Sequence, residues 1–170
     1  MLKRSLLVLV ASAAPVLAQA NPNPNTANAR ILWESMRDYI TQAAADVPEA
    51  TYAYRPTPEV RTFGEVIGHV AGSQKMFCAW ALGEKAPAED AVEKAAKTKA
   101  ALIAALKESN DYCARAYKTT DQANTAAVDI FGAKRTRMYA LLMNASHDAE
   151  HYGNIVTYMR MNKMVPPSSK

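Results

Sequence analysis

The three histidines of the chain are the residues best suited to carry chemistry. His147 and His151 are four residues apart in a segment with helical periodicity, so their side chains lie on one face of a helix. His69 lies in another helical segment, among apolar neighbours that should face the core. Because packed helices lie about 8–10 Å apart, an imidazole on one helix can meet two on its neighbour. The spacing therefore allows a metal site with three nitrogen ligands.

Three neutral imidazoles suit a divalent transition metal and leave room for water or substrate on the ion. We expect Zn or Ni, and Fe or Cu is compatible with the same ligands. Such an ion activates a bound water, or accepts a thiolate or an oxygen of a substrate. Nitrogens within about 4 Å of one another would fit a shared ion about 2.1 Å from each. The alternative is that the three histidines only pack in the core, and spacing alone does not decide.

Three residues beside the histidine pair are candidates for supporting such a site. Asn144 continues the inward face of the pair, and Tyr152 directly follows His151. Asp148 lies about 100° around the helix from His147, so we expect it to support the ligands or to face solvent. No Asp or Glu occupies a convincing fourth ligand position. Nucleophile elbows, phosphate-binding loops and glycosidase-type carboxylate pairs are missing too, so the catalytic residues stay unassigned.

The segments that position these side chains have apolar residues every three or four positions, as in amphipathic helices. We expect four helices, over roughly 26–45, 62–82, 98–118 and 134–161. Thr62 and Glu65 form a capping box, and Asn162 is expected to end the last helix in a left-handed conformation. Gly153 should mark a close approach of two helices. Residues 119–132 are expected to be a connection, and no segment alternates long enough to predict a sheet. The pattern predicts an all-α four-helix bundle.

Residues 1–20 have the order of a cleavable signal peptide. Lys3 and Arg4 precede an apolar stretch over 5–17, and small residues at 18–20 offer a cleavage site. The apolar stretch is shorter than the roughly 20 residues of a membrane-spanning helix. We therefore expect an exported protein, periplasmic or secreted, with no membrane association after cleavage. The alternative is an uncleaved N-terminal anchor.

Length and charge describe one domain without a nucleic-acid partner. The chain has 170 residues, enough for a single core, and a formal net charge of +4. Removal of Lys3 and Arg4 lowers this charge by two, and what remains forms no basic stripe, which argues against nucleic acid. Residues 21–29 contain two prolines and predict a polar linker. The bundle domain is then expected over 30–168.

The segments around the histidines resemble the DinB-like (YfiT-like) family. The first carries the sequence RTFGEVIGHVA over residues 61–71, and the second carries HDAEHYGNIVTYMR over 147–160. A Pro-Pro-Ser sequence at 166–168 and YRPTP at 54–58 also fit the family. The individual motifs are short, but their order is fairly specific. The similarity covers about residues 31–168.

This resemblance implies a fold and a class of activity. It implies an up-down-down-up bundle that often dimerises, with a divalent metal bound by His69, His147 and His151. The family is similar to thiol-dependent transferases and isomerases. We therefore expect an exported, metal-dependent transferase or hydrolase that acts on a small molecule. The alternative is a bundle that binds metal or a small ligand without turnover. Because low-molecular-weight thiols are mainly cytoplasmic, export argues against a mycothiol or bacillithiol cofactor.

Cys78 and Cys113 test the topology that the resemblance implies. Each cysteine lies at a similar distance from the start of its helix. In an antiparallel hairpin the two would be about 20–30 Å apart, beyond the reach of a disulfide, whereas in parallel helices they are level. An even pair in an exported protein favours a disulfide, and the parallel arrangement of the family permits it. The alternative is two buried free thiols.

Overall fold

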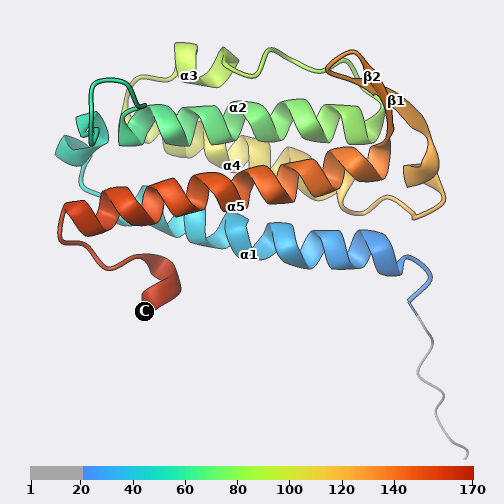
Figure 1. Cartoon of the computed structure of the whole chain (residues 1–170), viewed down its shortest axis with the longest axis horizontal. Helices are drawn as coiled ribbons and strands as arrows, with labels where there is room; N and C mark the ends of the chain where they lie inside the picture. Colours follow the sequence, from blue (N-terminus) through green and yellow to red (C-terminus); the bar gives the residue numbers. More distant parts are fainter. Residues whose placement is uncertain (1–20) are drawn as a thin grey trace, which may run out of the picture.

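A computed structural model describes residues 21–170, so the predicted signal peptide lies outside the described residues. In this range, four long helices pack side by side (Figure 1): α1 (Pro24–Asp46), α2 (Phe63–Leu82), α4 (Lys99–Ala116) and α5 (Arg137–Met161). Helices α1 and α5 run in one direction, and α2 and α4 run in the other. This is the predicted all-α bundle with up-down-down-up topology.

Short elements connect the long helices. They are the 3₁₀-helices η1 (Glu49–Ala53), η2 (Ala123–Thr125) and η3 (Pro167–Ser169), the short helix α3 (Ala91–Ala95), and the strands β1 (Ala127–Ile130) and β2 (Ala133–Thr136). We call residues 84–98, which lead from α2 through α3 to α4, the crossover segment. It lies along the outer side of α2 in Figure 1. Because it returns the chain to the starting end of the bundle, α2 and α4 can run parallel.

Local capping fixes the start and the end of α2. The Thr62 hydroxyl accepts a hydrogen bond from the backbone N–H of Glu65 at 3.2 Å, and the Glu65 carboxylate accepts one from the backbone N–H of Thr62 at 2.7 Å. This is the predicted capping box. Gly83 ends the helix in the left-handed conformation, with a φ of 74°. The register of α2, and with it the position of His69, is therefore set by local sequence.

The predicted linker over 21–29 is wrong from Pro24 onwards, where α1 begins. Proline suits the first turn of a helix, because its φ is already helical and its missing N–H would be unpaired there. The carboxylate of Asp121 accepts hydrogen bonds from the backbone N–H groups of Asn25 and Thr26, at 3.0 and 2.8 Å. These donors of the first turn are therefore satisfied by a residue distant in sequence, which a local pattern does not reveal.

The connection predicted over 119–132 also differs, because its end forms an antiparallel hairpin with the residues that follow. Ala127 of β1 is paired with Thr136 of β2, and Phe131 and Gly132 turn the chain with φ values of 50° and 78°. Four-residue strands are too short to show a clear alternating pattern. The ring of Phe131 lies 5.0 Å from that of Trp80. This contact holds the hairpin against the end of α2.

The end of α5 differs by one residue from the prediction. Asn162 has a φ of −97°, and the left-handed residue is Lys163, with a φ of 58°. The backbone N–H of Met164 then donates to the carbonyl of Met159 at 2.9 Å. A left-handed residue still ends the helix, but one position later than expected.

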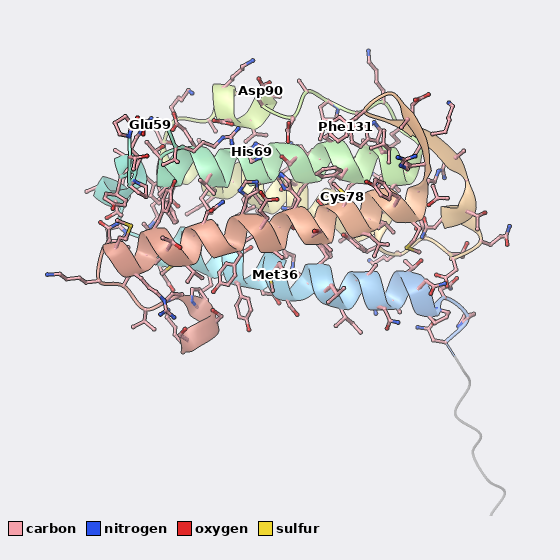
Figure 2. All side chains as sticks on the ribbon, viewed as in Figure 1. Met36, Glu59, His69, Cys78, Asp90 and Phe131 are labelled. Carbon is pink, nitrogen blue, oxygen red and sulfur yellow. A yellow bond between two sulfur atoms is a disulfide. The ribbon has the colours of Figure 1, made fainter. Side chains whose placement is uncertain are left out.

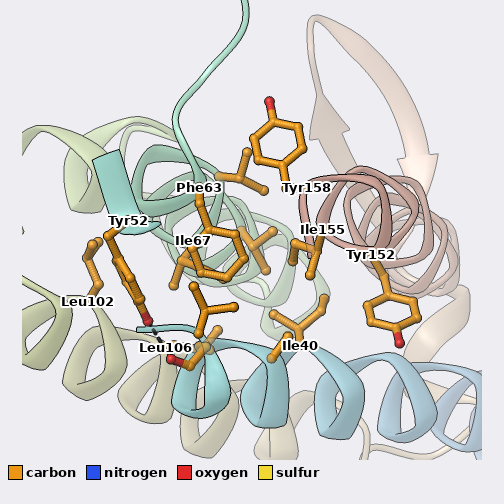
Figure 3. Packing of buried hydrophobic residues seen from close by; sticks show 14 of the residues in the cluster. Ile40, Tyr52, Phe63, Ile67, Leu102, Leu106, Tyr152, Ile155 and Tyr158 are labelled. Atoms are coloured by element: carbon orange, nitrogen blue, oxygen red, sulfur yellow. Dashed lines mark hydrogen bonds between the residues drawn. The ribbon is translucent and has the colours of Figure 1, made fainter. Parts of the chain in front are cut away.

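The described core forms two apolar clusters along the bundle axis. The first includes Ile40, Ile67 and Ile155 of three different helices, as Figure 3 shows. The second surrounds Trp33 and Tyr117, whose rings are stacked at 4.5 Å. The two clusters bury one side of α5, and α2 is buried around most of its circumference, because the crossover segment covers its outer side. This packing fixes the rotation of α2 and α5 and thus the direction of their histidines.

A disulfide joins Cys78 of α2 to Cys113 of α4, with their Cα atoms 5.3 Å apart. Both residues are fully buried in the second cluster. The predicted pairing is confirmed, and with it the parallel arrangement of α2 and α4 on which it depended. Among residues 21–170, none of the helices combines the length and the apolar character needed to cross a membrane.

Candidate metal centre

The three predicted ligands converge between α2 and α5. The Nε2 atom of His147 lies 3.2 Å from Nε2 of His69 and 3.1 Å from Nε2 of His151. One nitrogen of each ring lies within 4.8 Å of the others. Helix α2 supplies His69, labelled in Figure 2, and α5 supplies the pair from successive turns. The structure therefore brings together all three side chains that the sequence singled out.

Burial keeps these imidazoles neutral. Loss of hydration lowers the pKa of His69 to about 4, and the positive charge of Arg61 adds to this effect. Loss of hydration also lowers the pKa of His147 to about 3, with further contributions from His151 and His69. The pKa of His151 is lowered mainly by burial as well. At neutral pH the rings thus offer free nitrogen lone pairs, the form that a metal ion binds. The donor set fits a divalent ion.

The outward-facing Nδ1 atoms of two rings lie near polar partners. The side-chain amide of Asn154 lies 3.3 Å from Nδ1 of His151. A carboxylate oxygen of Glu93 lies 3.9 Å from Nδ1 of His69, and Arg61 donates from Nε to both Glu93 oxygens, at 3.1 and 3.2 Å. An imidazole that binds a metal through Nε2 carries its proton on Nδ1, so Asn154 would orient the ring of His151 by turning its amide oxygen toward this proton. Nδ1 of His69 has no hydrogen-bond partner among the described residues, and Glu93 lies only at ion-pair distance from it. None of the three was predicted from the sequence as a supporting residue.

Two of the supporting residues predicted beside the histidine pair, Asn144 and Tyr152, form hydrogen bonds with other parts of the protein. Asn144 donates from Nδ2 to the hydroxyl of Tyr117 at 3.1 Å, and the Tyr152 hydroxyl donates to Ser168 at 2.8 Å. Their hydrogen bonds lead away from the three imidazoles.

Asp148 does not face solvent, which was one of the two positions expected for it. It is fully buried, and neither of its carboxylate oxygens has a hydrogen-bond partner among the described residues. Burial raises the pKa of this carboxyl well above its ordinary value. The expectation failed because α5 packs against both α1 and α2, so its buried surface is wider than the histidine face alone.

The crossover segment brings a second acidic residue to the site. A carboxylate oxygen of Glu89, Oε1, lies 3.8 Å from Nε2 of His69 and 4.0 Å from Nε2 of His147. Glu89 is thus on the side where the three ring nitrogens meet, whereas Glu93 is on the outer side of His69. The sequence predicted no acidic residue at a fourth ligand position, because that prediction considered only residues close to the histidines in sequence. Glu89 approaches from a different segment.

Glycines of α2 allow this approach, and they are the sequence signal that could have revealed it. Gly64, Gly68 and Gly72 are four residues apart, so they form one stripe along the helix. A Cβ atom on Gly68 would lie 2.9 Å from Cα of Glu93, and one on Gly72 would overlap the carbonyl oxygen of Glu89. Only a helix surface without side chains lets the crossover backbone lie this close.

A cleft of about 560 Å³ opens beside His151. Its walls carry mostly charged and polar side chains, among them Arg55, Arg61, Glu65, Glu93, Asn154 and Tyr158. The volume is within the range of small-molecule sites in proteins. A small polar molecule in this cleft would contact the edge of the three-histidine cluster.

The fold and the site together define a structural class: a four-helix bundle in which α2 and α4 run parallel, with three histidines that converge between α2 and α5. Its sequence matches the DinB superfamily over residues 32–155, which is most of the chain. The protein therefore belongs to the DinB superfamily. No match was found among curated proteins.

Solved structures share the fold. A DinB-like protein from Bacillus cereus superposes with a TM-score of 0.72 at 17% identity, covering 83% of this chain and 95% of that one. A DinB-like protein from Bacillus subtilis gives 0.66 at 20% identity, covering 84% and 94%. A mutant of mycothiol-dependent maleylpyruvate isomerase gives 0.62 at 18% identity, covering 78% of this chain and 65% of that chain. At these identities the likeness describes the fold alone.

Proposed function

We propose that this protein is an exported, metal-dependent enzyme that acts on a small molecule in a transfer or hydrolysis reaction. Its divalent ion would be held by His69, His147 and His151. The observation that carries the proposal is the convergence of three neutral Nε2 atoms beside a polar cleft. When bound, an ion in such a site acts as a Lewis acid on a substrate oxygen or lowers the pKa of a bound water. Zn or Ni suits these ligands, as do Fe and Cu.

The residues around the cluster have roles that follow from their contacts. Asn154 orients the ring of His151, and the Glu93–Arg61 pair places a carboxylate 3.9 Å from Nδ1 of His69. The Tyr158 hydroxyl donates to the backbone carbonyl of Arg61 at 2.7 Å, which ties the wall of the cleft to α5. The polar groups of the cleft bind and orient the substrate, and burial of the histidines keeps bulk water away from them.

Two findings support export and small-molecule chemistry. Disulfides persist mainly in oxidising compartments, so the Cys78–Cys113 bridge is consistent with the signal peptide predicted over residues 1–20. One relative in fold is named as a mycothiol-dependent isomerase, which shows that this fold hosts chemistry on small molecules. We expect the mature protein to begin at Asn21, in the periplasm or medium, and N-terminal sequencing of the exported protein checks this.

Metal analysis of protein prepared without a histidine tag tests the proposal. We expect about one equivalent of a divalent metal after dialysis, and loss of that metal in His147→Ala, because the variant lacks the nitrogen that lies between the other two. Tyr152→Phe is the matched control on the same helix and should keep the metal. Wild-type protein that stays metal-free after loading with Zn, Ni, Fe and Cu would contradict the proposal. A substrate screen on the loaded protein then separates an enzyme from a binding protein.

A further inference from the structure

Glu89 faces the point where the three histidines meet. Its Oε1 atom lies 3.8 Å from Nε2 of His69 and 4.0 Å from Nε2 of His147, the two atoms that are themselves 3.2 Å apart. Zn–N bonds of about 2.0–2.1 Å and Zn–O bonds of about 2.0–2.2 Å place neighbouring atoms of a tetrahedral centre about 3.4 Å apart. The distances from the carboxylate oxygen to the two nitrogens therefore exceed the separation expected for two ligands of one ion by only about half an ångström.

Two contacts hold Glu89 in this place. Ser73, which is fully buried one turn after His69 on α2, donates from its hydroxyl to Oε1 of Glu89 at 3.1 Å. The backbone carbonyl of Glu89 lies against Gly72, where a larger residue would not fit. The side chain is anchored at both ends, while 41% of its surface remains exposed.

This carboxylate forms no ion pair with a Lys or Arg side chain of the described residues. Within residues 21–170, no Lys or Arg nitrogen lies within 4.0 Å of it, and the basic groups that face it are the imidazoles of His69 and His147. Imidazoles bind a metal in their neutral form, so the rings themselves do not balance the charge of the carboxylate. A divalent cation between the carboxylate and the rings would supply the missing charge, and carboxylate oxygen together with imidazole nitrogen is a common ligand set.

We propose that Glu89 is a fourth protein ligand of the metal centre, supplied by the crossover segment. This inference rests on the proposed function, because it requires an ion at His69, His147 and His151. A carboxylate ligand occupies a coordination position that three histidines would leave to water. With an ion bound, a substrate would reach it by displacing Glu89 or as an additional ligand. Glu89 thereby becomes a residue that controls access to the ion.

Binding of Co²⁺ to the full mature protein tests this proposal without any assay of activity. The visible absorption of Co²⁺ reports the number and kind of its ligands, and competition with a chelator gives the affinity. We expect Glu89→Gln to change the spectrum and to weaken binding at least tenfold, since loss of even an outer partner of a metal ligand costs about 10–100-fold. Ser73→Ala should weaken binding less, because it removes only the anchor of the carboxylate.

Asp90→Asn is the matched control. Asp90 is adjacent in sequence, and its carboxylate is paired with Lys94 rather than with a histidine. The variant removes one negative charge from the same segment and should keep the wild-type spectrum and affinity. A Glu89→Gln protein with both properties unchanged overturns the inference and leaves the three-histidine centre standing. A wild-type protein that binds no Co²⁺ overturns the proposed function, and the inference with it.

Discussion

At the scale of single residues, the two nitrogens of each imidazole have different surroundings. The Nε2 atoms point to a common centre, whereas Nδ1 of His151 faces Asn154 and Nδ1 of His69 faces Glu93. Nδ1 of His69 and Nδ1 of His147 are both buried without a hydrogen-bond partner among the described residues. The outward contact of His151 should therefore tune the site more strongly than the outward surroundings of His69 and His147.

Asn154→Ala is predicted to weaken metal binding. The substitution removes the amide beside Nδ1 of His151, so this ring loses the group that orients it. Loss of such a partner typically costs about 10–100-fold in metal affinity. Thr157→Ala, an exposed change one turn further along α5, serves as the control, because its hydroxyl bonds only to the carbonyl of Gly153. Equal affinities for both variants in chelator competition would contradict the role of Asn154.

Acid is predicted to destabilise the metal-free protein through its histidines. The unfolded chain takes up protons near pH 6.5, whereas folded His69 and His147 resist protonation down to about pH 4 and 3. The stability that these groups contribute is complete above about pH 6.5 and is lost as the pH falls toward 3. Urea unfolding with a chelator at pH 7.5 and 4.5 should show a drop that is smaller in His147→Gln. An identical drop in the variant would show that this ring titrates freely in the folded state.

At the scale of elements, local signals were predictable, as were the distant contacts marked by the histidines and the cysteines, whereas other contacts between distant segments were not. The capping box at Thr62 and the shared face of His147 and His151 depend on residues three or four apart, so periodicity revealed them. The start of α1 depends on Asp121, and the position of Glu89 depends on the close approach of the crossover segment to α2. Such contacts leave little trace in a local pattern. The clearest trace was the glycine stripe of α2.

Gly72→Ala is predicted to destabilise the protein, although alanine favours helices. Its Cβ would overlap the Glu89 carbonyl, and overpacking of this kind costs about 1–3 kcal/mol. Gly153→Ala is the matched control: Gly153 was expected to mark a close approach of helices, but a Cβ there meets no atom within 4 Å. This control should gain up to about 1 kcal/mol from helix propensity. Urea unfolding measures both, and a stabilising Gly72→Ala would contradict the proposed close packing.

At the scale of the whole molecule, the disulfide and the metal centre tie α2 to two different neighbours, the disulfide to α4 and the histidines to α5. Cys78 lies in the second apolar cluster with Cys113, whereas His69 lies nearer the start of α2 and faces α5. The homodimer that the family resemblance implies stays a prediction, and light scattering of the mature protein is the measurement for it.

Loss of the disulfide is predicted to lower stability without emptying the metal site. Replacing both Cys78 and Cys113 with Ala removes a cross-link between residues 35 apart, and such a loss costs about 2–4 kcal/mol. Metal content should stay at the wild-type level, because neither sulfur belongs to the histidine cluster. Urea unfolding and metal analysis of the same sample check both parts. Loss of metal from a folded double variant would show that the two features are coupled.

The most direct test of the three-histidine centre is to locate the ion itself. Crystals of the mature protein grown with Zn²⁺ or Ni²⁺ can be measured on both sides of the absorption edge of the metal, so that an anomalous difference map shows its position. We predict a single strong peak between α2 and α5, at bonding distance from the Nε2 atoms of His69, His147 and His151. A map without a peak at this place, from protein saturated with either metal, would contradict the account.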